Sequence, residues 1–339
     1  MSPSPASDLV ANGSTFSRPS LLLNSGCRMP MIGFGTLGGH GDAPRAADAP
    51  STMAQAVRTA LAAGYRHLDC AECYKNEAEI GAALQDAFAA GLARNDLFVT
   101  SKVWNTNHSK DHVRQACVRT LNNLGLQYLD LYLVHWPLAF RHTGQDLQPD
   151  VPRDDRGIVE SAKVSLQETW AAMEALVDEG LVRSVGVSNY STVELSDLLA
   201  YCRIPPAVNQ VECHPYLQQT SLRKLCAAAG CAIVAFSSLG GPVTQGRPCE
   251  RRLLEDTTLV GIAGAHGWTV AQLILRFLLQ EGLAVIPKSS SEDRLRENFG
   301  VGSLPPISKD DMSAIRGLDC GLRYNNFDWA FGGGMVFGP

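Results

Sequence analysis

The chain has 339 residues, 45% of them hydrophobic, with a formal net charge of −5 and a pI near 5.9. This length suits one large α/β domain or two smaller ones, and the composition is ordinary for a soluble protein with a sizeable core. The mild acidity gives no reason to expect nucleic acid or an anionic membrane as a partner, and no apolar run approaches the roughly 20 residues that span a bilayer. We therefore expect a soluble protein whose partners are small molecules or other proteins, with no nucleic-acid or membrane partner.

The ten cysteines are spread through predicted strands and helices. Cys70 and Cys73 form one CxxC pair, so a redox function is a minor alternative, although thioredoxin-like motifs place the pair at the start of a helix. We find no convincing signal peptide and expect reduced thiols, a cytoplasmic location and no metal site. Residues 1–20, rich in Ser, Pro and Ala, are expected to be a disordered tail, with organelle targeting as a minor alternative.

The first predicted element is a hairpin of two short strands around an Asn-Ser-Gly turn, within residues 21–30. The next segment, 31–38, contains Gly33, Gly35 and Gly38 and formally matches the dinucleotide fingerprint GxGxxG. A Rossmann turn is nevertheless unfavoured, because no helix opens at once and no acidic residue follows at the required spacing. An insertion from Gly38 to Pro50 follows, and its purpose stays open.

From residue 52 onward the pattern alternates between helical spacing and short apolar strands. Helices are predicted over 52–63, 77–89, 110–124, 166–179, 192–202, 220–229 and 269–280, with more helix before 266. Strands are predicted near 31, 67, 97, 129, 185, 207, 232 and 283, and a long polar loop spans 141–164. Eight strands, each followed by a helix or a long loop, predict a parallel (β/α)8 TIM barrel as a single domain over 21–339.

Polar residues follow the predicted strands at the end where a barrel carries its chemistry. Asp69 and Tyr74 come from the second strand, and a capping box between Asn76 and Glu79 predicts that a helix begins directly behind them. Each residue alone has an ordinary structural explanation, such as packing, capping or a satisfied core group. Their occurrence at consecutive strand ends favours one shared site.

A proton relay is the chemistry that these side chains support. Lys102, at the end of the third strand, can place an ammonium beside Tyr74 and lower the pKa of the phenol, while Asp69 balances the charge of Lys102. His135, after the fourth strand, can donate a hydrogen bond to a substrate oxygen. Ser188, Asn189 and Gln210 follow the fifth and sixth strands.

Six segments resemble motifs of the aldo-keto reductase superfamily, and they occur in the same order and at the same spacing as in that family. The resemblance is closest to the branch of aldose and xylose reductases. The six segments are GYRHLDCAECYKNE (64–77), VTSKVWN (99–105), LDLYLVHWP (129–137), GVSNY (186–190), NQVECHPY (209–216) and IPKSS (286–290). The resemblance covers about residues 21–329. It implies a barrel with an N-terminal capping β-hairpin and a C-terminal flap, with Tyr74 as general acid, Asp69 and Lys102 tuning it, and His135 orienting the carbonyl.

The resemblance also implies a cofactor, NADPH in preference to NADH. Ser188, Asn189 and Gln210 would hold the nicotinamide carboxamide, and Phe236 stands where the family commonly stacks a tyrosine. Lys288, Ser289, Ser290 and Arg294 resemble a clamp for the extra phosphate, which a solvated basic turn could also explain. The full set of expected cofactor-binding residues is Gly35, Thr36, Ser188, Asn189, Gln210, Phe236, Ser237, Leu239, Lys288, Ser289, Ser290, Arg294, Glu297 and Asn298.

The expected substrate is an aldehyde, most plausibly an aldose such as xylose, because segments 237–242 and 322–329 resemble the sugar-reducing branch. Expected substrate contacts are Leu37, Trp104, His135, Trp136 and Asn325; Leu37 stands where the family often has a tryptophan. A tail that merely covers the barrel is the alternative explanation for Asn325. Two other functions stay open: a broad-specificity carbonyl-detoxifying reductase and a nicotinamide-sensing subunit without catalysis. We expect a monomer or a weak homodimer.

Overall fold

A closed ring of parallel strands forms the centre of the computed structural model, which describes residues 19–38, 52–144, 151–240 and 252–325. The eight-stranded sheet runs in the order β10-β9-β8-β7-β6-β5-β4-β3, every neighbouring pair being parallel. A parallel bridge between Ile32 and Val285 joins the two edges, so the sheet closes on itself. The strands are β3 (Phe34–Gly35), β4 (His67–Asp69), β5 (Phe98–Val103), β6 (Leu131–Val134), β7 (Val185–Ser188), β8 (Val208–Glu212), β9 (Ala232–Phe236) and β10 (Ala284–Val285).

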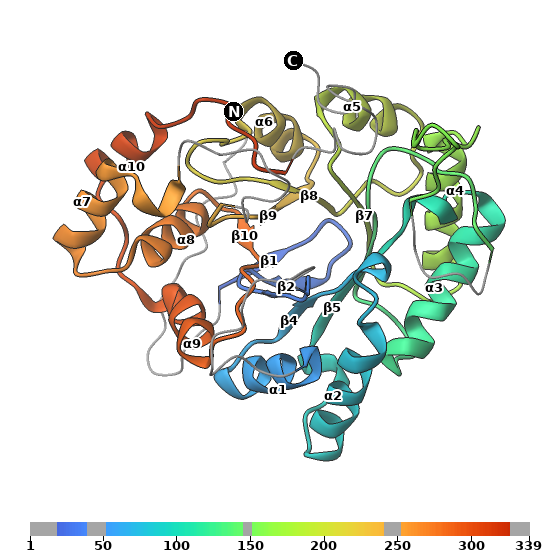
Figure 1. The fold of residues 1–339 in the computed structure, drawn as a ribbon, viewed down its shortest axis with the longest axis horizontal. Coiled ribbons are helices and arrows are strands. Elements are labelled where there is room, and N and C mark those ends of the chain that lie inside the picture. Colours follow the sequence, from blue (N-terminus) through green and yellow to red (C-terminus); the bar gives the residue numbers. More distant parts are fainter. Residues whose placement is uncertain (1–18, 39–51, 145–150, 241–251, 326–339) are drawn as a thin grey trace.

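Helices surround this ring and alternate with its strands (Figure 1). They are α1 (Met53–Ala63), α2 (Glu77–Ala89), α3 (Lys110–Leu124), α4 (Leu166–Asp178), α5 (Thr192–Tyr201), α6 (Thr220–Ala228), α7 (Thr257–His266), α8 (Val270–Gln280), α9 (Glu292–Gly300) and α10 (Lys309–Arg316). One-turn 3-10 helices lie at η1 (Glu72–Tyr74), η2 (Arg94–Asp96), η3 (Asn105–Asn107), η4 (Leu253–Glu255) and η5 (Val301–Ser303). The predicted (β/α)8 barrel is confirmed.

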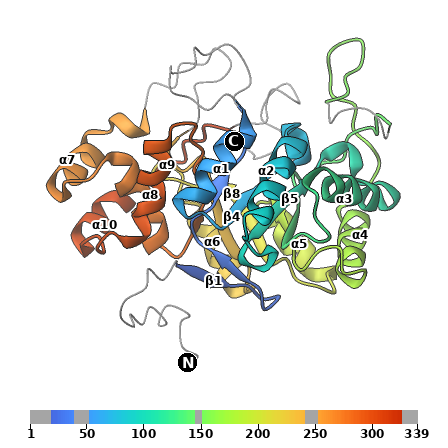
Figure 2. The ribbon, with the colours of Figure 1, turned by 90° about the horizontal axis from the view of Figure 1, so that it is seen from below.

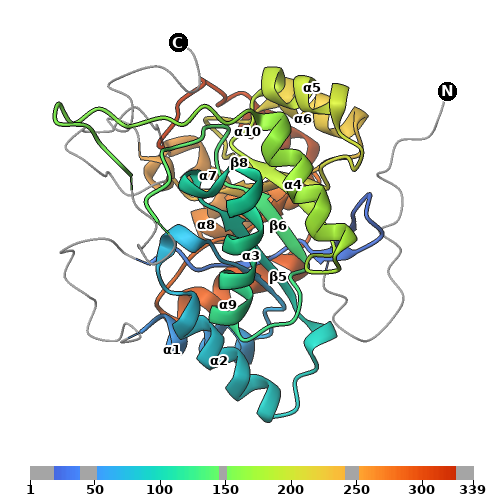
Figure 3. The same cartoon turned by 90° about the vertical axis from the view of Figure 1, so that its right-hand side faces the viewer.

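The two ends of the barrel are differently covered. The predicted hairpin is present as β1 (Ser20–Leu22) paired antiparallel with β2 (Arg28–Pro30), and it caps one end. Figures 2 and 3 show the described segment that leads into α4, residues 151–165, projecting at the opposite end. This described part of the connection between β6 and α4 therefore lies at the end away from the hairpin.

The segments of β3 and β10 meet where the barrel closes, and we call this junction the barrel seam. Their close approach explains the glycines in and before β3. A Cβ on Gly35 would lie 2.6 Å from the carbonyl oxygen of Ile286, a contact that no side chain tolerates. Gly33 and Val285 are joined across the same seam by a 2.8 Å backbone hydrogen bond. The GxGxxG match thus coincides with barrel closure, where the backbone itself requires glycine.

The capping box predicted for α2 is wrong, although the helix does begin at Glu77. The Asn76 side chain makes no capping bond, because its Nδ2 donates to the carbonyl oxygen of Thr36 at 2.8 Å. The Glu79 carboxylate accepts instead from the backbone nitrogen of Met53 at 3.0 Å. Tertiary partners have replaced the local ones that the spacing indicated.

Helix α10 was not anticipated from the sequence; it has only eight residues, with Ser308 capping its first turn. No single helix among the described residues is long and apolar enough to cross a bilayer. Helices α7 and α8 reach that length and composition only as a pair, bent by 89°. Parts of several predicted segments lie outside the described residues. They are the tail up to residue 18, most of the insertion before Pro50, and the ends of segments 237–242 and 322–329, with Pro242 and Trp329.

Candidate active site

A buried ion pair joins the ends of β4 and β5. The Lys102 Nζ donates to Asp69 Oδ2 at 2.7 Å and to the carbonyl oxygen of Cys70 at 2.9 Å. Neither side chain is more than 2% exposed. An isolated charge at this depth would be strongly unfavourable, so each group depends on the other. The structure therefore brings Asp69 and Lys102 together as the sequence predicted.

Gln210, on β8, adds a third member to this pair. Its Nε2 donates to Asp69 Oδ1 at 2.7 Å, so both carboxylate oxygens of Asp69 are hydrogen-bonded. The sequence placed Gln210 among the residues that would face a cofactor and gave no sign of a contact with Asp69. Its amide nitrogen is committed to the ion pair, which leaves Oε1 as the atom with which it could accept from a ligand.

Tyr74 stands over this buried charge at the end of η1. Its ring centroid lies 5.2 Å from Lys102 Nζ and 6.0 Å from the centroid of the His135 ring, which it meets edge-on. Burial, together with the Asp69 carboxylate, raises the pKa of the Tyr74 phenol well above its usual value. The predicted lowering of this pKa is therefore wrong for the protein alone: Asp69 neutralises the Lys102 ammonium, and desolvation disfavours the phenolate. The phenol holds its proton, as a proton donor must.

His135 follows β6 and is 8% exposed. Burial and the nearby Lys102 hold the pKa of its imidazole well below the usual range, so the ring is neutral. Trp104 packs edge-on against it, with ring centroids 5.2 Å apart. A neutral imidazole has one donor nitrogen and one acceptor nitrogen, so the ring can offer a substrate oxygen a hydrogen bond without carrying charge.

The turn that carries Tyr74 is fixed by a buried carboxylate that the sequence reasoning did not single out. Glu72 accepts from the backbone nitrogen of Trp104 at 3.1 Å and from Asn107 Nδ2 at 3.0 Å, and it pairs with Arg119. These contacts tie η1 to η3 and α3. Glu72 lies two residues before Tyr74, so these contacts anchor the turn from which the phenol extends.

The residues after β7 offer an unused acceptor. Asn189 has a positive φ of 61° and donates from Nδ2 to the carbonyl oxygen of His135 at 3.0 Å. Its Oδ1 is buried and has no hydrogen-bond partner. Ser188 donates from Oγ to the carbonyl oxygen of Gln210 at 2.8 Å. A buried, unpaired amide oxygen at a strained position fits a ligand that carries N–H donors, such as a carboxamide.

The expected phosphate clamp lies where β10 leads into α9. Lys288 and Arg294 are exposed, and Ser290 is half-buried. The buried Ser289 accepts on its Oγ from the backbone nitrogen of Ser291 at 3.1 Å. No side chain caps the start of α9, so the first turn offers backbone N–H groups beside two cations, an arrangement that fits an anionic group.

Two of the expected cofactor-binding residues, Glu297 and Asn298, lie on α9 itself. Asn298 is buried, and the Glu297 carboxylate accepts from Thr269 Oγ1 at 2.5 Å. Thr36, expected near the cofactor, is buried and donates from Oγ1 to the carbonyl oxygen of Asp69 at 2.8 Å. Thr36 and Glu297 thus have partners within the protein.

The end of β9 and the C-terminal segment meet above the barrel. Asn325 donates from Nδ2 to Ser237 Oγ at 2.8 Å, and Ser237 has a positive φ of 49°. The buried Glu212 accepts from the backbone nitrogens of Tyr324 at 2.7 Å and Asn325 at 2.9 Å. Glu212, which the sequence did not single out, therefore fastens this segment, and Phe236 and Leu239 lie half-buried on either side of Ser237.

An apolar cluster stands beside His135. It contains Trp104, Trp136, Phe140 and Val159, with Cys73 packed against it. The two tryptophans were expected here, whereas Phe140 and Val159 belong to a loop whose contacts local sequence does not specify. Leu37, the other expected substrate contact, is 47% exposed.

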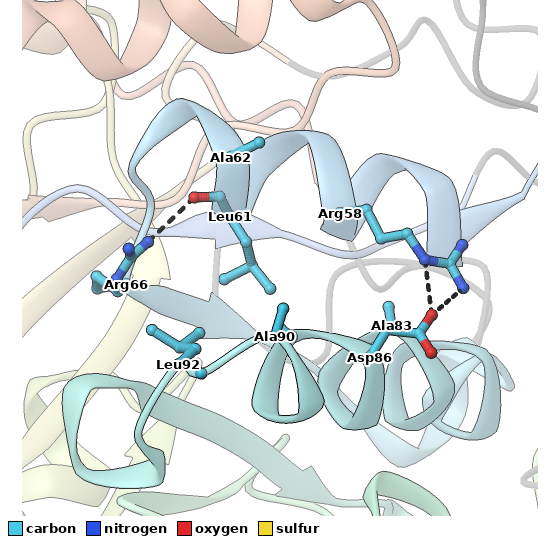
Figure 4. A pocket seen from close by; sticks show the side chains of 10 residues that line it. Arg58, Leu61, Ala62, Arg66, Ala83, Asp86, Ala90 and Leu92 are labelled. Carbon is cyan, nitrogen blue, oxygen red and sulfur yellow. Dashed lines mark hydrogen bonds and ion pairs between the residues drawn. The ribbon is translucent and has the colours of Figure 1, made fainter.

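A groove of about 530 Å³ lies elsewhere, between α1 and α2 on the outside of the barrel (Figure 4). Arg58 in its wall pairs with Asp86 at 2.6 Å, and Arg66 donates to the carbonyl oxygen of Leu61 at 3.1 Å. Its other lining residues are alanine, leucine and glycine. No Tyr, His, Cys, Ser or Lys lines this groove, and its one carboxylate, Asp86, is paired with Arg58, so the strand-end cluster is the better candidate. Among the described residues, no group of three or more His, Cys, Asp or Glu could hold a metal ion.

Comparisons with known proteins agree with this geometry. Residues 31–319 match the family model described as "Aldo/keto reductase family". The chain is 46% identical over 299 residues to aldose reductase B of Dictyostelium discoideum, covering 87% of this chain and 90% of the relative. It is 42% identical over 311 residues to aldo-keto reductase family 1 member A1-A of Danio rerio, covering 90% and 91%. The solved aldose reductase of Schistosoma japonicum superposes with a TM-score of 0.83 at 38% identity, covering 94% and 98%.

Proposed function

The chain belongs to the aldo/keto reductase family, as an oxidoreductase of the aldehyde/aldose reductase type, and we propose that it reduces aldehydes to alcohols with NADPH, aldoses being its main substrates. The observation that carries the proposal is the buried Asp69–Lys102 pair beneath Tyr74, with a neutral His135 facing the same phenol. This arrangement supplies a proton donor and a hydrogen-bond donor to one carbonyl oxygen.

The proposed roles follow from the state of each side chain. The neutral His135 donates to the carbonyl oxygen and directs it toward Tyr74. The protonated Tyr74 gives its proton to that oxygen as negative charge develops there, and the Lys102 ammonium stabilises the phenolate that remains. Asp69 accepts a hydrogen bond from Lys102 and balances its charge, and Gln210 keeps Asp69 oriented.

The proposed cofactor fits the residues present. Asn189 Oδ1 and Gln210 Oε1 are the acceptors that would hold the carboxamide, and Phe236 would pack against the ring. Lys288, Arg294 and the uncapped start of α9 would hold the additional phosphate. NADPH, when bound, supplies the hydride; the fixed cations would favour it over NADH.

An aldose is favoured as substrate because Asn325 and Ser237 place an amide and a hydroxyl together at the barrel mouth. Polar groups of this kind can bind sugar hydroxyls. Relatives bearing the name aldose reductase support the same choice. The apolar cluster of Trp104 and its neighbours favours a second candidate, a broad carbonyl reductase that prefers aromatic or short aldehydes.

A substrate panel tests the proposal. Purified protein is mixed with NADPH and with glyceraldehyde, xylose or an aromatic aldehyde, and cofactor consumption is followed. NADPH consumption that depends on the sugars, with a kcat/KM higher for the sugars than for the aromatic aldehyde, supports the aldose assignment. A kcat/KM far higher for the aromatic aldehyde favours the second candidate, and tight NADPH binding without turnover of any aldehyde contradicts both.

A further inference from the structure

One ring nitrogen of His135 faces a cysteine. The Cys73 Sγ lies 3.5 Å from His135 Nδ1, within hydrogen-bond distance for sulfur. Cys73 directly precedes Tyr74 on η1, so the same short turn carries both the phenol and the thiol that approach the imidazole. Tyr74 and Trp104 both meet the ring edge-on and restrict its orientation.

The contact has a preferred direction. Burial raises the pKa of the Cys73 thiol, so the sulfur keeps its proton, and the low pKa of His135 keeps the ring neutral. A neutral ring carries its single proton on Nδ1 or on Nε2. A thiol is a weak donor and its sulfur is a weak acceptor, but an imidazole nitrogen lone pair is the strongest acceptor in the contact. The favourable arrangement is therefore S–H donating to Nδ1, with the ring proton on Nε2.

We propose that Cys73 is a positioning residue that fixes the tautomer of His135, so that Nε2 carries the proton and is available to donate to the substrate carbonyl oxygen. This inference rests on the proposed function. It extends that function to a residue whose side chain acts through His135 without touching the reacting atoms.

The alternative tautomer shows why the contact matters. With the proton on Nδ1, the ring would present a lone pair from Nε2 toward the carbonyl oxygen, and the two lone pairs would repel. A hydrocarbon side chain at position 73 would also leave Nδ1 without a partner beside the apolar cluster. Loss of the thiol should therefore reduce the reaction of bound substrate more than its binding.

Two substitutions separate hydrogen bonding from packing. Cys73→Val keeps an apolar side chain of similar size and removes the donor, whereas Cys73→Ser restores an O–H donor. Cys27→Val, at another half-buried cysteine near the hairpin at the far end of the barrel, is the matched control. We expect kcat for glyceraldehyde to fall about tenfold in Cys73→Val, the equivalent of one hydrogen bond, with a smaller change in KM. We expect Cys73→Ser and Cys27→Val to stay within about twofold of the wild type, well below that one-bond effect.

The tautomer is measured directly by ¹⁵N NMR of protein labelled at its histidine ring nitrogens, with the His135 signals assigned from His135→Asn. A protonated Nε2 in the wild type, with a mixture or a protonated Nδ1 in Cys73→Val, supports the inference. A protonated Nδ1 in the wild type overturns it, as do unchanged kcat in Cys73→Val or equal losses in the Ser and Val variants. The NMR result does not depend on turnover, so failure of wild-type aldehyde reduction would count against the proposed function alone.

Discussion

Replacing Lys102 by methionine should destabilise the protein strongly, because it leaves the Asp69 carboxylate buried without its countercharge. Lys102 Nζ and Asp69 Oδ2 are 2.7 Å apart, with side-chain exposures of 0% and 2%. Gln210 Nε2 would remain as a neutral donor to Asp69. Removing one member of such a buried pair costs about 3–5 kcal/mol of unfolding free energy, a large part of the roughly 5–15 kcal/mol that a typical domain has.

A double-mutant cycle distinguishes the buried charge from lost packing. Urea unfolding at pH 7, followed by circular dichroism, would compare the wild type, Lys102→Met, Asp69→Asn and the double variant. The double variant removes both charges, so we expect it to be more stable than Lys102→Met alone by about 2 kcal/mol or more.

The exposed pair Arg296–Glu292 is the matched control. Arg296 Nη2 and Glu292 Oε1 are also 2.7 Å apart, but each side chain is 58% exposed. Arg296→Met should therefore change the unfolding free energy by no more than about 0.5 kcal/mol. The reasoning would be refuted if Lys102→Met cost as little as this control, or if the two single losses simply added in the double variant.

Three further predictions concern the pH dependence of stability, the cofactor and the substrate. Burial raises the pKa of Glu77 from 4.5 to about 7, so its stabilising contribution is fully present below pH 4.5 and is lost as the pH rises to about 7, a fall of about 3 kcal/mol. Urea unfolding across this pH range should show that fall in the unfolding free energy of the wild type and not of Glu77→Gln. If the unfolding free energies of the two proteins changed in parallel with pH, the prediction would be contradicted. Arg294→Ala should raise KM for NADPH about tenfold or more, which corresponds to the loss of one charge-assisted hydrogen bond, and leave KM for NADH nearly unchanged. Steady-state kinetics in which KM rises equally for the two cofactors would exclude a phosphate contact. Asn325→Ala should lower kcat/KM for xylose about tenfold, which corresponds to the loss of one hydrogen bond, and lower kcat/KM for a short aldehyde much less. An equal fall in kcat/KM for both substrates would mean that the segment with Asn325 only covers the barrel.

The rule that polar residues follow buried parallel strands was sufficient to predict much of the candidate site. Asp69, Lys102 and His135 are far apart in sequence, yet each lies at the end of a strand or directly after it. A barrel brings strand ends together whatever the loops do. The spatial meeting of these residues could therefore be predicted without knowing a single tertiary contact.

Contacts that depend on tertiary packing could not be predicted in this way. Asn76 has the spacing of a helix cap, but the carbonyl of Thr36 lies within reach of its amide and takes the hydrogen bond. Glu72 looks like an ordinary acidic residue in a turn until Arg119 and Asn107 are placed around it. The direction of the Tyr74 pKa shift could not be predicted from the motif, because desolvation, which depends on the whole fold, outweighs one nearby ammonium that Asp69 already neutralises.

The central claim, that Tyr74 gives the proton in an aldehyde reduction, is tested most directly by Tyr74→Phe. NADPH consumption with glyceraldehyde and the NADPH dissociation constant, from fluorescence titration, would be measured for the wild type and the variant. The account predicts a fall in kcat of at least about 100-fold, as expected for loss of a general acid, with an unchanged dissociation constant. Turnover close to that of the wild type in Tyr74→Phe would contradict it.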